Sequence, residues 1–157
     1  MISVQSIMSL FALVLLSKVT LSTNHSIIDS FKNMLEIQGR VSALAEANNL
    51  LDEISSKDYD QTKGVKPAEF TPSSLLGPDG SETYPNFNDV DDYNRLKRTI
   101  PSSIFSNGLA LTVSVSYVNP LNTVQVSTAP TMAKRVDLLI FNSALGETLK
   151  IQQVFYH

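Results

Sequence analysis

The positions of apolar and polar residues divide the chain into three parts, of which the first is apolar on all sides. From Met1 to Ser17 there is no charged side chain, and Lys18 is the first charge. A helix over Met1–Leu21 would be about 31 Å long at roughly 1.5 Å per residue, close to the thickness of the hydrocarbon core of a membrane. Scattered polar residues dilute it, namely Ser3, Gln5, Ser6, Ser9, Ser17 and Ser22. The pattern predicts an apolar helix over residues 1–26.

A removable secretory signal peptide is the alternative interpretation of this segment. Such a peptide begins with basic residues, continues with a short apolar core and ends in a small-x-small cleavage site. No Lys or Arg precedes Lys18, and Val19-Thr20-Leu21-Ser22 is a poor cleavage site. The sequence therefore favours a retained helix that either spans a membrane or packs against copies of itself.

The second part, residues 27–56, has the spacing of a single helical face. Apolar or small residues recur three and four apart, at Ile27, Phe31, Met34, Val41, Leu44, Ala45, Leu51 and Ile54. This spacing predicts an amphipathic helix that continues the first one and lies on a folded domain. Gly39 weakens its middle by up to about 1 kcal/mol relative to Ala.

The third part begins with a long loop and ends in strands. Residues 57–108 contain most of the prolines and no periodicity, although their aromatic and leucine side chains suggest a loop that lies on the domain. Residues 109–157 then alternate apolar and polar positions as half-buried strands do. The inward positions are Leu111, Val113, Val115 and Tyr117 in one strand and Val136, Leu138 and Ile140 in the next, followed by a third strand within residues 147–156 and a ragged edge strand at residues 124–126.

A sheet with one apolar face needs a cover, and the amphipathic helix is the segment that can supply it. We expect Ala45 and Leu51 to lie under the sheet against Val113, Val115 and Ile140. The predicted fold class is α+β, with a long N-terminal helix packed on a small antiparallel sheet.

Composition narrows the function to structure or binding. The 157 residues carry a net charge of −3, which gives no basic surface for nucleic acid. The chain has no cysteine and two histidines, His25 and His157, so the material for catalysis or for a histidine or thiolate metal site is scarce. We expect no enzyme activity and no cofactor.

Several stretches together resemble the type IV pilin and pseudopilin superfamily, and within it minor pilins of the mannose-sensitive haemagglutinin pilus type. These stretches are "ALAEANNLLDEISSKDYD", "FNDVDDYN", "LALTVSVSYVNP" and "AKRVDLLIF". The resemblance covers most of the chain and implies a pilin-like head at residues 27–157. It also implies a subunit held in the bacterial inner membrane and then assembled, with its own copies and other pilins, into an extracellular filament. The start departs from the family pattern, because Gln5 stands where a mature pilin has Glu and no leader glycine is present.

On this resemblance, the residues expected to mediate self-assembly lie in the first part of the chain. They are Met1, Gln5, Ile7, Leu10, Phe11, Leu13, Val14 and Leu16. Two other functions stay open: a minor pseudopilin or binding module that remains anchored in the inner membrane, and an exported adhesin.

The acidic loop is the candidate metal site. Asp89, Asp91 and Asp92 offer the hard oxygen ligands that calcium prefers, with Asn86 and Asn88 nearby. Pseudopilins bind calcium in this general region, so the resemblance points the same way. The spacing does not match an EF-hand, and basic residues follow closely at Arg95, Lys97 and Arg98. A solvated loop that is neutralised by these bases and serves only to anchor the chain is the competing interpretation.

Overall fold

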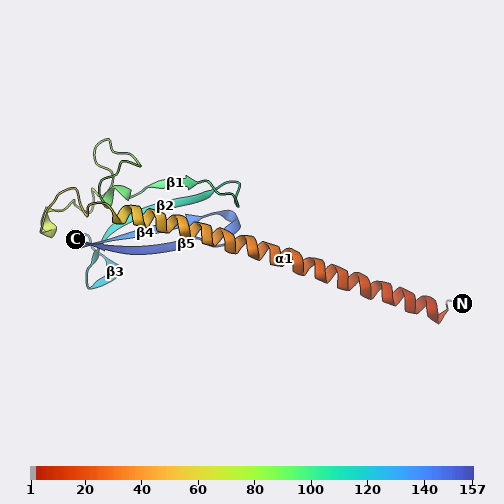
Figure 1. The fold of residues 1–157 in the computed structure, drawn as a ribbon. Coiled ribbons are helices and arrows are strands. Elements are labelled where there is room, and N and C mark those ends of the chain that lie inside the picture. The colour runs from red at the N-terminus through yellow and green to blue at the C-terminus, as the bar shows by residue number, and fades with distance from the viewer. Residues whose placement is uncertain (1–2) are drawn as a thin grey trace. The chain divides into compact units, whose positions relative to one another are not determined.

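The computed structural model describes residues 3–157 and has the predicted α+β class, with one long helix and a five-stranded antiparallel sheet (Figure 1). Helix α1 runs Val4–Ser55. The chain divides into two compact units, Met1–Gln38 and Gly39–His157. The second unit, called the head below, begins at residue 39, and no side chain described between residues 27 and 38 is buried.

Serine side chains mark both ends of α1. At the start, Ser3 Oγ accepts a hydrogen bond from the backbone N–H of Ser6 at 3.3 Å, as a helix N-cap does. At the end, the hydroxyls of Ser55 and Ser56 donate to the carbonyls of Asp52 and Glu53 at 2.8 and 2.6 Å. These bonds satisfy carbonyl groups that have no partner within the helix. The C-terminal end of α1 is therefore capped by serine hydroxyls and not by the glycine that often follows a helix.

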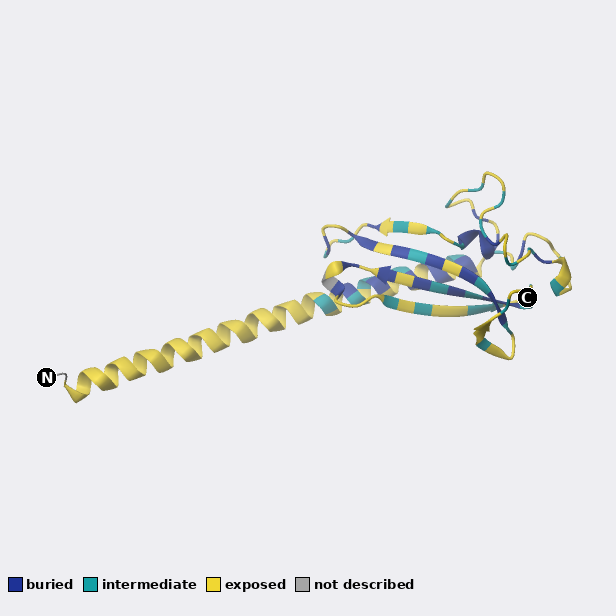
Figure 2. Ribbon diagram, turned by 180° about the vertical axis from the view of Figure 1, so that it is seen from behind, coloured by how far each residue is buried: buried dark blue, intermediate teal, exposed yellow. Residues whose placement is uncertain are grey.

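The sheet confirms the alternation seen in the sequence. Its path is β1 (Lys97–Ile100), β2 (Leu109–Asn119), β4 (Ala133–Phe141) and β5 (Leu149–Tyr156), and β3 (Asn122–Val126) pairs with the far end of β2. Val113 faces Leu138, and Val115 faces Val136. All four of these side chains are buried, as are Leu111, Tyr117 and Ile140, whereas the intervening positions of β2 are exposed or half-buried (Figure 2).

The last turns of α1, from Gly39 onward, cover the apolar face of the sheet, as expected (Figure 1). The predicted helical face is confirmed in part: Leu51 and Ile54 are buried, but Ala45 is exposed, and so are Val41 and Leu44. The buried residues are Gly39, Ala43, Ala47, Leu50, Leu51 and Ile54. Gly39, Ala43 and Ala47 are small and let the helix backbone approach closely, whereas Leu50, Leu51 and Ile54 fill the core near the end of the helix.

Gly39 shows how close that approach is. A Cβ atom at this position would lie 2.2 Å from Cζ of Phe105 and 3.2 Å from Cδ2 of Leu145. Real Cβ contacts are not so short, so a side chain here would push the Phe105 ring away. The glycine that weakens the helix in isolation is thus the residue that lets the last turns of α1 pack against Phe105 and Leu145.

The predicted loop over residues 57–108 contains more structure than its sequence suggests. It includes β1 and two short 3-10 helices, η1 (Pro67–Glu69) and η2 (Asp91–Tyr93). Strand β1 escaped prediction because its sequence, Lys-Arg-Thr-Ile, carries only one buried side chain, Ile100. The loop does lie down on the domain, since Phe70, Leu76 and Phe87 are buried, but Leu75 stays exposed.

Candidate functional site

The N-terminal part of α1 presents an apolar surface that is exposed in the part of the chain that the structure describes. Every described residue from Ser3 to Leu35 is exposed. The exposed fraction is 66% for Phe11 and 61% for Leu13. The other self-assembly candidates, Gln5, Ile7, Leu10, Val14 and Leu16, are exposed as well, and Met1 lies outside the described residues. A contiguous apolar surface is unfavourable in water and is typical of a segment that contacts lipid or other protein.

Polar side chains on this helix are partly satisfied within it. The hydroxyls of Thr20, Thr23 and Ser30 donate to the carbonyls of Leu16, Val19 and Ser26 at 2.8 to 2.9 Å. Such hydroxyls need no partner from outside, which lowers the cost of placing them in an apolar medium. An 18-residue window of α1 reaches a mean hydropathy of 1.8 with no residue buried. The helix is a candidate membrane span by length and composition.

A second distinctive site lies inside the head, around Lys134. This residue is on β4, in the same alternating register as Val136, Leu138 and Ile140, so its side chain points into the protein and is 0% exposed. Sequence reasoning missed it. Extending the alternation by two positions toward the N-terminus would have placed a lysine in the core.

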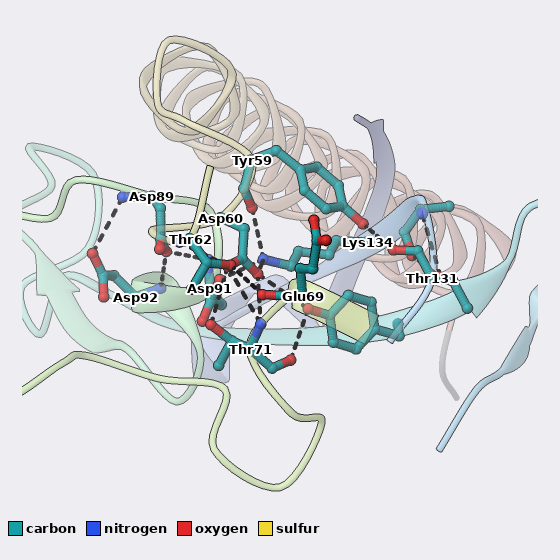
Figure 3. Close-up of polar contacts among 12 residues, drawn as sticks. Tyr59, Asp60, Thr62, Glu69, Thr71, Asp89, Asp91, Asp92, Thr131 and Lys134 are labelled. Atoms are coloured by element: carbon teal, nitrogen blue, oxygen red, sulfur yellow. Dashed lines mark hydrogen bonds and ion pairs between the residues drawn. The ribbon is translucent and has the colours of Figure 1, made fainter. Parts of the chain in front are cut away.

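Three oxygen atoms surround the Lys134 amine (Figure 3). Nζ donates to the Tyr59 carbonyl at 2.6 Å, to Asp60 Oδ2 at 2.9 Å, and to Asp91 Oδ1. The Tyr59 ring centroid is 4.6 Å from Nζ, and the Tyr117 ring centroid is 5.4 Å away. An ammonium group has three protons to donate, and here each finds an acceptor in a site lined by aromatic rings.

Asp60 ties the segment that follows α1 into this cluster. Its carboxylate accepts hydrogen bonds from the Thr62 hydroxyl at 2.6 Å and from the Thr71 amide at 3.1 Å, in addition to the bond from Lys134. Burial opposes ionisation of Asp60, but the hydrogen bonds from Thr62 and Lys134 outweigh it and hold the pKa of this carboxyl below its usual value. Asp60 is therefore a stable anion inside the protein.

The acidic loop is buried rather than solvated, so the solvated-loop interpretation is wrong. Asp89, Asp91 and Asp92 are each 1% exposed. The base that meets this loop is Lys134, which pairs with Asp91, and none of the ion pairs found among residues 3–157 joins the loop to Arg95, Lys97 or Arg98.

The two other carboxylates of the loop hold its backbone turn. Asp89 Oδ1 accepts hydrogen bonds from the amides of Asp91 and Asp92 at 2.9 and 3.2 Å, and Asp92 Oδ2 accepts one from the Asn88 amide at 2.9 Å. Burial, followed by the charges of Asp91 and Asp92, raises the pKa of Asp89 to about 7. Among the described residues, no group of three His, Asp or Glu side chains has an arrangement that could hold a metal ion. The structure does not test calcium binding at this loop.

Each of the two histidines lies next to one of these sites. His25 is exposed on α1, and the ring of His157 lies 5.4 Å from that of Tyr59 and 5.1 Å from that of Phe70, measured between centroids. Comparison with protein-family models, with curated proteins and with solved structures finds no match for this chain. Its function must therefore be argued from its own residues.

Proposed function

We propose that this chain is a structural subunit of a type IV pilus-like extracellular filament and that it assembles through its N-terminal helix. The observation that carries the proposal is the apolar surface of α1, from Val4 to Leu21, which is uncharged except for Lys18 and exposed throughout. Two environments can cover such a surface, a lipid bilayer and the helices of neighbouring copies. A filament subunit uses the bilayer first and its neighbours afterwards.

The proposed transfer of α1 from the bilayer to neighbouring helices gives the serines of its apolar segment a role. Taking a side chain such as Leu13 out of water contributes about 1.5–3 kcal/mol, but a helix in lipid has already gained this. Assembly from the membrane must therefore be driven by close packing and by hydrogen bonds between helices. Ser6, Ser9 and Ser17 supply small side chains for close approach, at positions that are exposed.

Gln5 has a defined role in this proposal. It is exposed near the start of α1, among apolar residues. Its amide oxygen can accept a hydrogen bond from the terminal amine of a neighbouring copy in a place without water, where an unpaired donor would be costly. A glutamine can make this bond but not an ion pair, so we expect a weaker contact than a glutamate would give.

A membrane-anchored binding module is the second candidate, favoured by the candidate span in α1 and by a groove on the head. The groove has a volume of about 570 Å³ and is lined by residues that include Leu75, Tyr84 and Arg95. On this alternative the helix stays in the bilayer and the head binds its partner through the groove. The two functions differ in whether copies of α1 contact one another.

The test is a charge placed deep in the apolar segment. Leu13→Asp puts a carboxylate where the filament core would be, at a position that is 61% exposed in the single chain. We expect this variant to form no filaments while the head stays folded, because an unpaired buried charge is strongly unfavourable. Ser81→Asp, at an exposed loop position of the head, is the matched control and should assemble normally. Normal filaments from the Leu13→Asp chain, seen by electron microscopy, would favour the anchored module.

A further inference from the structure

Lys134 is the one fully buried amine among residues 3–157, and it lies between two buried carboxyl groups. One belongs to Asp60, which follows α1, and the other to Asp91, in η2. Keeping one ammonium and two carboxylates in a dry interior is costly, because the desolvation of ions there rivals or exceeds their mutual attraction. The cluster has a chemical route that removes two of these charges.

The geometry points to a covalent bond: we propose that Lys134 and Asp91 condense to an intramolecular isopeptide bond, with Asp60 as the proton carrier. Lys134 Nζ is in contact with the Asp91 carboxyl group and is held on its other sides by Asp60 Oδ2 at 2.9 Å and the Tyr59 carbonyl at 2.6 Å (Figure 3). Two reacting groups fixed in contact gain the large rate advantage of an intramolecular reaction.

The reaction balances without any added reagent. Asp60 first passes one proton of the Lys134 ammonium to the Asp91 carboxylate, and the lone pair of the neutral amine then attacks Cγ of the neutral Asp91 acid, forming a C–N bond. Asp60 next takes a second proton from this nitrogen. The tetrahedral centre then collapses as the C–O bond breaks, and the departing hydroxyl group takes the proton back from Asp60. The products are an amide and one water molecule, and Asp60 returns to its carboxylate form.

The environments of the two carboxyl groups suit these different roles. Hydrogen bonds from Thr62, Thr71 and Lys134 hold Asp60 as an anion, so the form that can accept a proton is the one present. Its pKa lies below the usual value, although burial alone would raise it. Burial, only partly offset by Lys134, raises the pKa of Asp91 and so favours its neutral form. A neutral carboxylic acid is the better electrophile, and the burial of Lys134 and Asp91 keeps bulk water from competing.

The bond would join η2 to β4 across 43 positions of sequence. The loop that carries the acidic residues would then be covalently part of the sheet. This inference concerns the head alone and does not depend on the proposed filament, so its test and that of the filament fail independently.

Mass spectrometry of the purified full-length chain tests the proposal directly. We expect its intact mass to be lower than the mass calculated from the sequence by one water molecule. Trypsin should release residues 64–95 linked to residues 99–135, because a modified Lys134 is not cleaved. Lys134→Arg keeps the positive charge but should show the full calculated mass and no linked peptide.

Two further variants separate this reaction from other losses of water. Asp91→Asn should form the same bond with loss of ammonia and reach the same final mass as the reacted wild type. Asp60→Asn should leave most of the chain unlinked. Asp79-Gly80 can lose water by closing to a succinimide, which would lighten peptide 64–95 without linking it. A full wild-type mass, or a loss of water confined to an unlinked peptide 64–95, would overturn the proposal.

Discussion

Replacing Ile54 by Ala tests whether α1 is an integral part of the head. Ile54 lies in the last turns of the helix, is 0% exposed and belongs to the core formed with β2 and β4. Truncating a buried isoleucine removes apolar contacts and leaves a cavity, which costs about 2–5 kcal/mol. For a urea dependence of roughly 2 kcal/mol per M, this loss lowers the unfolding midpoint by about 1–2.5 M.

The matched control is Val41→Ala on the same helix. Val41 is 61% exposed, so its truncation should change the free energy of unfolding by no more than about 0.5 kcal/mol. Tyrosine fluorescence can follow unfolding, because the chain has no tryptophan and Tyr93 and Tyr117 are wholly buried. If Ile54→Ala lowers the midpoint no further than Val41→Ala does, the helix does not stabilise the sheet and the account of the core is wrong.

Three other predictions concern the apolar helix and the acidic loop. Removing residues 1–38 should give a soluble monomer on size-exclusion chromatography, while the full chain without detergent should polymerise or precipitate; a full-length monomer would contradict this. Because the pKa of Asp89 is raised from 3.8 to about 7 in the folded state, the native protein binds this proton more tightly than the unfolded chain does. Its stabilising contribution is complete below about pH 4 and is lost as the pH rises through about 7. Asp89→Asn should flatten the fall in urea midpoint over that range, and an unchanged pH dependence would refute the assignment. Calcium should leave the melting temperature of the head nearly unchanged, since a ligand stabilises only by binding the native state; a large rise that Asp91→Asn abolishes would show that these carboxylates are ligands.

The regular parts of the fold could be predicted because their sequence periodicity is local. Alternation fixed the inward side chains of β2 and β4, such as Val113 and Leu138, since each strand buries one face. Leu51 and Ile54 were predicted correctly, but the preceding turns of the helix were misplaced because the buried positions there are small residues such as Ala43 and Ala47 rather than the larger Val41 and Leu44. That choice depends on how close the two layers come, which periodicity does not encode.

The two candidate sites also differ in how far they could be predicted from the sequence. The apolar helix surface, with Leu13 at its centre, follows from composition along one segment. The buried cluster joins Asp60, Asp91 and Lys134, which are up to 74 positions apart. Only the folding of the loop onto β4 brings them together. The available signal in the sequence was Lys134, a charged residue at an inward position of a strand. Such a position indicates a buried ion pair, but it does not identify the partners of the lysine.

Disulfide crosslinking of single-cysteine variants tests the central claim most directly, because the chain has no cysteine of its own. Leu13→Cys places a thiol in the apolar segment, and Ser81→Cys places one on the exposed loop of the head. In filaments sheared from cells and oxidised, the account predicts disulfide-linked dimers from Leu13→Cys and monomers from Ser81→Cys. If the sheared material contains the Leu13→Cys chain only as monomers, or contains none of it, α1 is not the shared core of a filament and the central claim is contradicted.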